Sequence, residues 1–358
     1  MIKNNQRVSR GSRLGSVVAV AVGLALVLAG CSTAAPAPTT TNAGTGTLLS
    51  SVEELKLSEE QIAEIESRDL TFGFLVNNIA DDFSKSLVDS AQKAADEYGI
   101  TLLVNSGDFD SNKQLSQFNA LVQQGVDGIF LTAVDAASIG TAVVKANEAN
   151  IPVFIVGGPP GRGDVISVMN AASYDGSKEA AAVMMDAIGE PNAQIAVIGI
   201  PFALQTIRDR EKGVLDAVGA AGGQIVSLQS DFNQDRLLAL ATNAIEANPD
   251  LRGIFATWSL GVNAAVEAVK QSGRTDIIVA GYDSEAAGYL EFAADNPNLV
   301  ALSGQQAFVQ GYAAIEGLAQ AVLGNSLAPE IITPNLLVTP DNYAEQWAVQ
   351  YPGTPAPF

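Results

Sequence analysis

The chain has 358 residues, 47% of them hydrophobic and 16% charged, which is enough for two packed lobes rather than one core. Its formal net charge is −20, and so acidic a surface disfavours nucleic-acid partners because it repels phosphate backbones. The absence of histidine excludes His-based catalytic triads and His metal sites, and the single cysteine, Cys31, excludes a disulfide framework. Carboxylate-based or lysine-based enzymes stay open on composition alone.

The first 30 residues are arranged as a secretory signal. Four basic residues precede an apolar run over residues 17–28, which is too short for a comfortable transmembrane helix. The tetrapeptide that ends in Cys31, Leu-Ala-Gly-Cys, resembles the lipobox of bacterial lipoproteins. We therefore expect residues 1–30 to be a lipoprotein signal peptide and Cys31 to carry a lipid; a plain secretory signal is the alternative. Removal of the leader leaves 15 basic and 39 acidic residues, a net charge of −24.

The segment that follows, residues 31–69, is expected to comprise the lipidated Cys31, a flexible stalk and a short acidic helix. Residues 32–50 are rich in Ala, Pro, Thr and Gly, a composition that predicts a flexible stalk. Further along, Ser58 precedes two glutamates, which is the pattern of an N-cap with acids in the first helical turn. A short acidic helix is expected there.

From Leu70 onward, short apolar runs alternate with helical patterns. Strands are expected at residues 71–76, 101–104, 126–132, 152–156, 165–169, 194–198, 224–228, 253–256, 277–280 and 300–303, with helices between most of them. Strand–helix alternation with fully apolar strands is typical of parallel sheets covered on both faces. The sequence therefore predicts an α/β fold of two doubly wound parallel-sheet lobes, whose ligands would lie beyond the carboxyl ends of the strands.

Two motifs resemble ion or phosphate sites without meeting their requirements. Residues 108–112 begin like a calcium loop, but Lys113 stands where the turn glycine belongs and Asn119 where the bidentate glutamate belongs. A helix N-terminus is the better interpretation. Residues 157–163 resemble a phosphate cradle, yet they precede a strand and lack the Lys-Ser/Thr pair, so a loop at the rim of a cleft is expected.

The loop after the first strand carries three candidate ligand contacts. Asn77 and Asp81 offer hydrogen bonds and Phe83 offers an apolar face. The alternative for the acids is structural, because Asp81 or Asp82 would also serve as the N-cap of the following helix.

Four more candidates follow strands or open helices further along the chain. On a helical wheel, Arg210 lies closer to the apolar face than Arg208 and is the better candidate to point into a cleft; an exposed salt bridge is the alternative. Trp258 suggests a stacking platform or ordinary packing. Asp283 could accept bonds from vicinal hydroxyls or cap a helix, and Gln305 could donate and accept at once.

Several stretches between Leu70 and about Val338 carry a family pattern in register, namely residues 86–96, 125–129, 149–153, 208–213 and 281–283. With them the chain resembles the sugar-binding proteins of bacterial ABC importers, in the ribose-type group of type I periplasmic binding proteins. The resemblance implies a ligand held between two lobes that close about a three-stranded hinge. The hinge crossings would lie near Ala172, Gln305 and Pro334.

The resemblance also implies lobe boundaries and a set of site residues. It places residues 70–171 plus 306–334 in the N-terminal lobe and residues 172–305 plus 335–358 in the C-terminal lobe. The implied ligand contacts are Asn77, Asp81, Phe83, Arg210, Phe232, Trp258, Asp283 and Gln305. Aromatic rings would pack on the C–H faces of a sugar ring while the polar side chains bond its hydroxyls.

The chain departs from the pattern at three places. Gly157-Gly158 replaces an Asp-Arg pair, Ser84 replaces a second aromatic beside Phe83, and Trp258 replaces an asparagine. These changes remove hydroxyl-binding groups and make ribose itself doubtful, so a different sugar, a polyol or a less polar solute is expected; Arg162 could partly compensate.

The resulting prediction is a substrate-binding lipoprotein for carbohydrate transport. It would hold a small carbohydrate or polyol, deliver it to an ABC transporter permease, and be anchored to the cell membrane through its lipid. We expect a monomer without catalysis, metal, cofactor or nucleic-acid partner. A sensor that presents a bound sugar to a chemoreceptor or histidine kinase is the alternative. The effector domain of a transcription repressor is disfavoured because no basic helix-turn-helix precedes the body, and a secreted carboxylate hydrolase is disfavoured by the resemblance.

Overall fold

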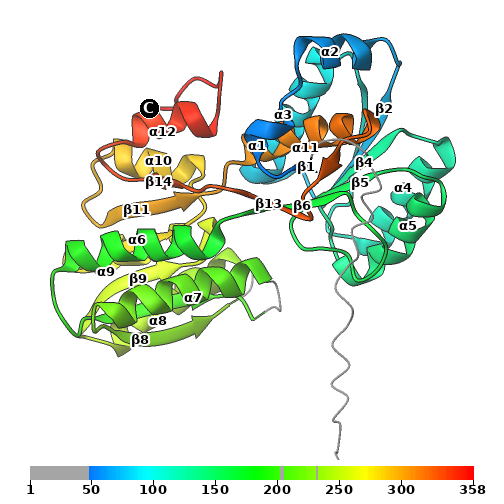
Figure 1. Cartoon of the computed structure of the whole chain (residues 1–358). Helices are drawn as coiled ribbons and strands as arrows, with labels where there is room; N and C mark the ends of the chain where they lie inside the picture. Colours follow the sequence, from blue (N-terminus) through cyan, green and yellow to red (C-terminus); the bar gives the residue numbers. More distant parts are fainter. Residues whose placement is uncertain (1–47, 202–204, 231–232) are drawn as a thin grey trace, which may run out of the picture. The chain divides into compact units, whose positions relative to one another are not determined.

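The computed structural model describes residues 48–201, 205–230 and 233–358 (Figure 1). Cys31, with the expected signal peptide and most of the stalk, lies outside these residues, and so does Phe232. Within the described ranges, no helix has both the length and the apolar character to cross a membrane.

The first lobe is built on a six-stranded parallel sheet. Its strands, in the order β13-β6-β5-β4-β2-β3, are β2 (Thr71–Val76), β3 (Thr101–Ser106), β4 (Gly128–Leu131), β5 (Val153–Val156), β6 (Ser167–Ala171) and β13 (Glu330–Thr333). The accompanying helices are α3 (Asp82–Glu97), α4 (Ser111–Gln124), α5 (Ala136–Glu148) and α11 (Ala307–Val322). Asp110 and Asp135 cap α4 and α5 by accepting hydrogen bonds from backbone amides in the first turn. The structure thus makes Asp110 a helix cap, as expected for residues 108–112.

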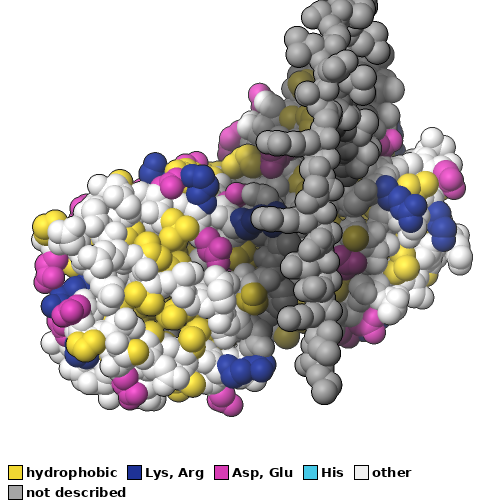
Figure 2. Space-filling model, turned by 90° about the horizontal axis from the view of Figure 1, so that it is seen from below, with side chains coloured by type: hydrophobic (Ala, Val, Ile, Leu, Met, Phe, Trp, Pro, Cys, Tyr) yellow, Lys and Arg dark blue, Asp and Glu magenta, His cyan; other side chains and the backbone are white. Residues whose placement is uncertain are grey.

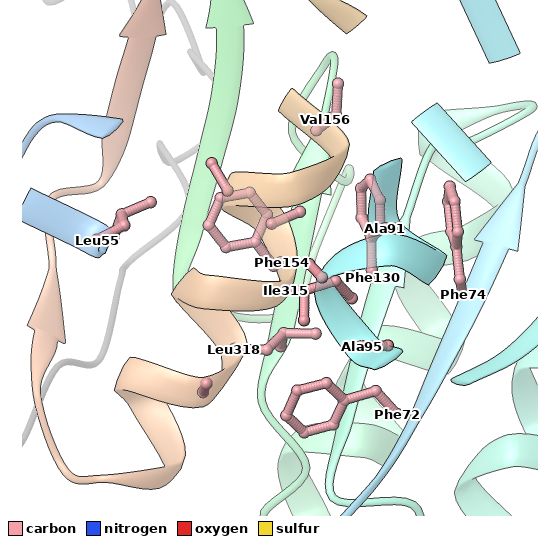
Figure 3. Packing of buried hydrophobic residues seen from close by; sticks show 14 of the residues in the cluster. Leu55, Phe72, Phe74, Ala91, Ala95, Phe130, Phe154, Val156, Ile315 and Leu318 are labelled. Carbon is pink, nitrogen blue, oxygen red and sulfur yellow. The ribbon is translucent and has the colours of Figure 1, made fainter. Parts of the chain in front are cut away.

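The core of the first lobe lies on both faces of its sheet. On one face, Phe72, Phe74, Phe130 and Phe154 pack against α3 and α11, as Figure 3 shows. The rings of Phe74 and Phe130 are stacked with centroids 4.0 Å apart. On the other face, a second cluster joins the strands to α4 and α5. Because helices cover both faces of this sheet, most of its strands are continuous apolar runs in the sequence.

Residues 48–69 are part of this lobe. They comprise β1 (Leu48–Leu49), α1 (Val52–Leu55) and α2 (Glu59–Glu66), and β1 pairs in parallel with β12 (Ser326–Leu327). Ser58 caps α2 in a capping box with Gln61. Leu55 is fully buried in the core of the lobe, and Gln320 of α11 donates to its backbone oxygen at 3.1 Å (Figure 3). This segment is therefore packed in place.

The second lobe has a sheet of the same size with one antiparallel edge. Its strands, in the order β14-β11-β10-β9-β7-β8, are β7 (Gln194–Gly199), β8 (Gln224–Gln229), β9 (Leu251–Ala256), β10 (Ile278–Tyr282), β11 (Leu299–Gly304) and β14 (Leu336–Val338). Only β14 runs antiparallel to its neighbour. The helices are α6 (Ser173–Ile188), α7 (Gln205–Ala220), α8 (Gln234–Ala247), α9 (Ser259–Ser272), α10 (Ala286–Ala293) and α12 (Tyr343–Gln350). The predicted α/β fold with two parallel-sheet lobes is confirmed.

The chain passes between the two sheets three times. It leaves the first sheet after β6, returns after β11 to form α11, and passes again between β13 and β14. Tyr282, at the end of β10, bonds to residues at two of these crossings. Its hydroxyl donates to Asn335 Oδ1 and lies 3.4 Å from Ser173 Oγ, while Asn335 Nδ2 donates to the backbone oxygen of Ala172. Tyr282 is fully buried, so these bonds are shielded from water.

Charged side chains are spread over the surface. On the face displayed in Figure 2, acidic and basic side chains are interspersed among uncharged ones rather than gathered into one patch of either sign. Many of the ion pairs among the described residues join exposed partners one helical turn apart, such as Lys93 and Glu97. Such pairs contribute little to stability, at most about 1 kcal/mol each.

Candidate functional site

An acid, a base and an amide meet at the carboxyl ends of β10 and β11. Asp283 follows β10, and its two carboxylate oxygens accept from different donors: Oδ1 from Gln305 Nε2 at 3.0 Å and Oδ2 from Arg210 Nη1 at 3.2 Å. The side chain of Asp283 is 18% exposed, so it is largely but not fully withdrawn from water. Its backbone has φ +69°, in the left-handed region that Asp tolerates better than most residues.

Arg210 is held in place by three kinds of contact. Besides the ion pair with Asp283, its Nη1 donates to the backbone oxygen of Thr257 at 2.9 Å, and its guanidinium carbon lies 3.8 Å from the centroid of the Tyr282 ring. Arg210 is 5% exposed, whereas Arg208 is exposed and bonds Gln205 on its own helix. A guanidinium that is buried against an aromatic face and a carboxylate has its charge well compensated.

Asp283 does not cap the helix that follows it. The helix α10 begins at Ala286 with Glu285 at the N-cap, two residues later than a cap at Asp283 would require. The carboxylate of Asp283 is therefore committed to Arg210 and Gln305, and the capping alternative is wrong for this residue.

The first lobe places its candidates at the end of β2 and the start of α3. Asp81 is the N-cap of α3: its Oδ1 accepts from the Ser84 amide at 2.7 Å, and its Oδ2 accepts from Asn78 Nδ2 at 2.7 Å. The structural alternative for Asp81 is thus what the structure shows. Asn77 Oδ1 accepts from the Asn78 amide at 2.9 Å. Phe83 is half-buried and packs against the core of the lobe.

Three of the predicted ligand contacts line one hollow. The site hollow, as we call it, is lined by Asp82, Phe83 and Ser86 of the first lobe and by Asp283, Glu285 and Gln305, together with Ser284, Ala307, Gln350 and Tyr351. Asn77, Asp81, Arg210 and Trp258 are not among its lining residues. Arg162 is not either; it lies against Gly140 of α5. The hollow thus brings together Phe83, Asp283 and Gln305, with Arg210 behind Asp283.

Trp258 belongs to the core of the second lobe. It is the N-cap residue of α9, it is 4% exposed, and it packs within the hydrophobic cluster that includes Ile198 and Val262. The structure thus favours ordinary packing over the expected stacking platform. Trp258 directly precedes the first residue of α9, Ser259, and its side chain is part of the core cluster that the helix and the sheet share.

Sequence reasoning missed Glu285, Gln350 and Tyr351. Burial, followed by the nearby charge of Asp283, raises the pKa of the Glu285 carboxyl to about 7, partly offset by a hydrogen bond with Ser259. Glu285 could have been found from the sequence, because it lies two residues after Asp283, a candidate that was already identified. Gln350 and Tyr351 follow Val338, beyond the stretch that carries the resemblance, and nothing in the local sequence pointed to them.

The loop after β10 and the end of α12 approach the backbone of β11 closely at Gly304. A Cβ at Gly304, the last residue of β11, would lie 2.0 Å from Ser284 Oγ and 3.3 Å from Gln350 Oε1. Only a residue without a side chain lets the loop after β10 and the end of α12 meet β11 here. The described residues contain no group of three or more His, Cys, Asp or Glu side chains arranged to hold a metal ion.

Known proteins share both the sequence and the fold. The family described as periplasmic binding protein domain matches residues 72–326. The ribose import binding protein of Bacillus subtilis is 30% identical over 217 residues, covering 60% of this chain and 70% of that protein. The one from Escherichia coli is 29% identical over 242 residues, covering 67% and 81%.

Solved structures give the same architecture. A periplasmic solute-binding protein of an ABC transporter from Actinobacillus succinogenes, with bound D-allose, has TM-score 0.71 at 21% identity, covering 77% of this chain and 99% of that one. One from Bacillus halodurans, with bound myo-inositol, has TM-score 0.69 at 21% identity, covering 79% and 98%. The chain therefore belongs to the periplasmic binding protein family and is a sugar-binding-type solute-binding protein of ABC importers rather than an enzyme.

Proposed function

We propose that this protein is an extracytoplasmic lipoprotein that captures a small carbohydrate-like ligand between its lobes and delivers it to an ABC importer. Residues 1–30 are its signal peptide, and Cys31 is the lipidated residue that anchors it to the cell membrane. The basic start, the apolar run and the position of the chain's single cysteine support this proposal. The protein acts as a monomer that presents its ligand to a permease.

The observation that carries the binding proposal is the cluster of Asp283, Arg210 and Gln305 at the strand ends of the second lobe. It faces a hollow that is also lined by Phe83 of the first lobe. Asp283 accepts hydrogen bonds from ligand hydroxyls, and Phe83 packs on a C–H face of the ligand. Asn77, Asp81, Phe232 and Trp258 complete the proposed set, with Trp258 the weakest member because it is buried in the core.

Closure of the lobes is the proposed way in which binding is signalled to the permease. The proposed lobes comprise residues 70–171 plus 306–334, against which residues 48–69 pack, and residues 172–305 plus 335–358, with hinge crossings near Ala172, Gln305 and Pro334. A ligand that bonds side chains of both lobes stabilises the closed state more than the open one, because only the closed state makes both sets of contacts.

The ligand class follows from the polar groups of the hollow. Related proteins are named for ribose, D-apiose and xylitol. In this chain the described lining residues of the hollow include the carboxyl groups of Asp82, Asp283 and Glu285 and no basic side chain, while Arg210, which contacts Asp283, is already paired with it. Because carboxylates repel anions, we propose a neutral sugar or polyol rather than a sugar acid.

Calorimetric titration of the full chain with ribose, xylitol, D-allose, myo-inositol and gluconate tests this proposal. We expect at least one neutral compound to bind and gluconate not to bind. Asp283→Asn leaves one hydroxyl partner unsatisfied and should weaken binding by about 1–3 kcal/mol, or about 5- to 150-fold. Arg208→Ala, on an exposed position of the same helix as Arg210, is the control and should bind like wild type. Failure of every neutral compound to bind, or wild-type affinity in Asp283→Asn, would contradict the proposal.

Anchoring has a separate test. The Cys31→Ser variant, expressed with its leader, should leave the membrane fraction, whereas Ser32→Ala should stay with it. Retention of Cys31→Ser in the membrane fraction would contradict lipidation at this residue.

A further inference from the structure

The helix α12 packs onto the second lobe through a cluster of aromatic rings. Figure 1 shows α12 beside α10, and the two helices are in contact. The ring of Trp347, which is 6% exposed, lies edge-on to Tyr289 at 5.1 Å and 4.4 Å from the ring of Tyr351. Its Nε1 donates to the backbone oxygen of Thr354 at 3.0 Å. Several aromatic contacts of this kind, each worth about 0.5–1.5 kcal/mol, fix the helix relative to the sheet.

The end of this helix reaches the segments that carry the proposed ligand contacts. Gln350 is 6% exposed, and its Nε2 donates to the backbone oxygen of Gln305 at 2.6 Å. The hydroxyl of Tyr351 donates to the backbone oxygen of Ser284 at 3.3 Å. Gln350 therefore bonds the backbone of the lining residue Gln305, and Tyr351 bonds the backbone of Ser284, which is next to the lining residue Asp283.

Tyr351 also lines the site hollow itself, together with Phe83. Tyr351 is half-buried. Burial, followed by the negative charge of Asp82, raises the pKa of its hydroxyl, which therefore stays a neutral donor. Ser84, next to Phe83, is buried and bonded to Asp81, and it offers no ring to the hollow.

We propose that Tyr351 is a ligand-contacting residue and that its ring limits the size of the solute the site accepts. This inference rests on the proposed function, because it assigns a further contact to the same site. The ring, directly after the end of α12, supplies an apolar face in addition to that of Phe83, and such faces suit the C–H faces of a pyranose or furanose. Its hydroxyl bond to Ser284 fixes the ring orientation, so the wall is preorganised before the ligand arrives.

Calorimetry on the full chain with ribose, xylitol, D-allose and myo-inositol tests this assignment in four proteins: wild type, Tyr351→Ala, Tyr351→Phe and Val349→Ala. Removal of the ring should weaken binding of the preferred compound about tenfold. For the largest compound that binds, the factor by which Tyr351→Ala weakens binding should be at least about threefold smaller, because the absence of the ring leaves more room in the site hollow. Tyr351→Phe keeps the ring and should stay within about threefold of wild type. Val349→Ala is the control, because Val349 lies two residues before Tyr351, is 40% exposed and is not a lining residue.

The outcomes separate the two proposals. If wild type binds none of the four compounds, the proposed function is contradicted and this inference falls with it. If wild type binds but Tyr351→Ala keeps the same affinities, the inference alone is wrong. It is also wrong if Tyr351→Ala lowers the melting temperature and weakens all compounds by one common factor, since that result indicates a purely structural role.

Discussion

The ion pair between Arg210 and Asp283 should stabilise the fold at the proposed site, and a double-mutant cycle can measure the interaction energy of the pair. Arg210→Met keeps a long side chain but removes the partner of a carboxylate that is 18% exposed. Breaking a buried pair costs about 3–5 kcal/mol. Because Asp283 is partly exposed and keeps Gln305, we expect the lower end, about 3 kcal/mol. For a large domain that corresponds to a fall in melting temperature of about 6–12 °C.

The double variant should lose less than the sum of the single losses. Asp283→Asn leaves the Arg210 charge, 6% exposed in its side chain, without its acid and should also cost about 3 kcal/mol. When Arg210→Met is combined with Asp283→Asn, neither charge is left unpaired, and the new amide oxygen at position 283 can still accept from Gln305. We therefore expect a coupling energy of about 2 kcal/mol, within the range found for residues in direct contact.

Urea unfolding of all four proteins at one pH gives the cycle, and calorimetry on the same samples gives ligand affinity. Arg208→Met is the matched control; Arg208 is exposed on the same helix, so the substitution should change stability by less than about 0.5 kcal/mol. If the two single losses add to within about 0.5 kcal/mol in the double variant, Arg210 and Asp283 do not act as a pair and the reasoning is refuted.

Two further predictions concern other buried polar groups. Tyr282→Phe removes the hydroxyl that bonds Asn335 and Ser173 but keeps the ring that contacts Arg210. Urea unfolding should show that the free energy of unfolding falls by about 1–3 kcal/mol, while calorimetry should show ligand affinity within about threefold of wild type. An unchanged free energy of unfolding would contradict a stabilising role for these bonds. Burial raises the pKa of Glu316 to about 7, above the 4.5 of an exposed glutamate, so the folded state keeps a proton that the unfolded chain releases and stability falls as pH rises through this range. Between pH 4.5 and 7, the free energy of unfolding of Glu316→Gln should fall by about 3 kcal/mol less than that of wild type, as measured by urea unfolding at several pH values. The same pH dependence in both proteins would show that Glu316 does not cause the fall.

The fold could be predicted because its signals are local. The strand expected at residues 71–76 is β2, Thr71–Val76, and a strand buried on both faces must be apolar throughout. Helix ends were readable for the same reason: Ser58, expected to begin a helix, is the N-cap of α2. Each of these features depends on the few residues beside it and on burial in general, rather than on a particular distant partner.

The site was harder to predict because its side chains have distant partners. Helical periodicity distinguished Arg210 from Arg208, since both lie on one helix and only one is on its buried side. No such pattern shows that Trp258 packs inward, because its position depends on where α9 begins and on the cluster around it. The segment that carries Tyr351 is held at the hollow in part by the packing of Trp347 on Tyr289, a contact between residues 58 positions apart in the sequence.

Asp283 shows how one residue can serve the fold and still be available to a ligand. A carboxylate offers about four acceptor positions, and the bonds from Arg210 and Gln305 occupy two of them. These two donors fix the carboxylate in one orientation, so a ligand hydroxyl can bond to it without the entropy cost of ordering the side chain. Arg210 also compensates its negative charge at a place where Glu285 lies close by. Under the proposed function, a site built this way offers hydroxyl acceptors without a basic side chain among its described lining residues, and this is the basis for proposing a neutral polyhydroxyl ligand rather than an acid.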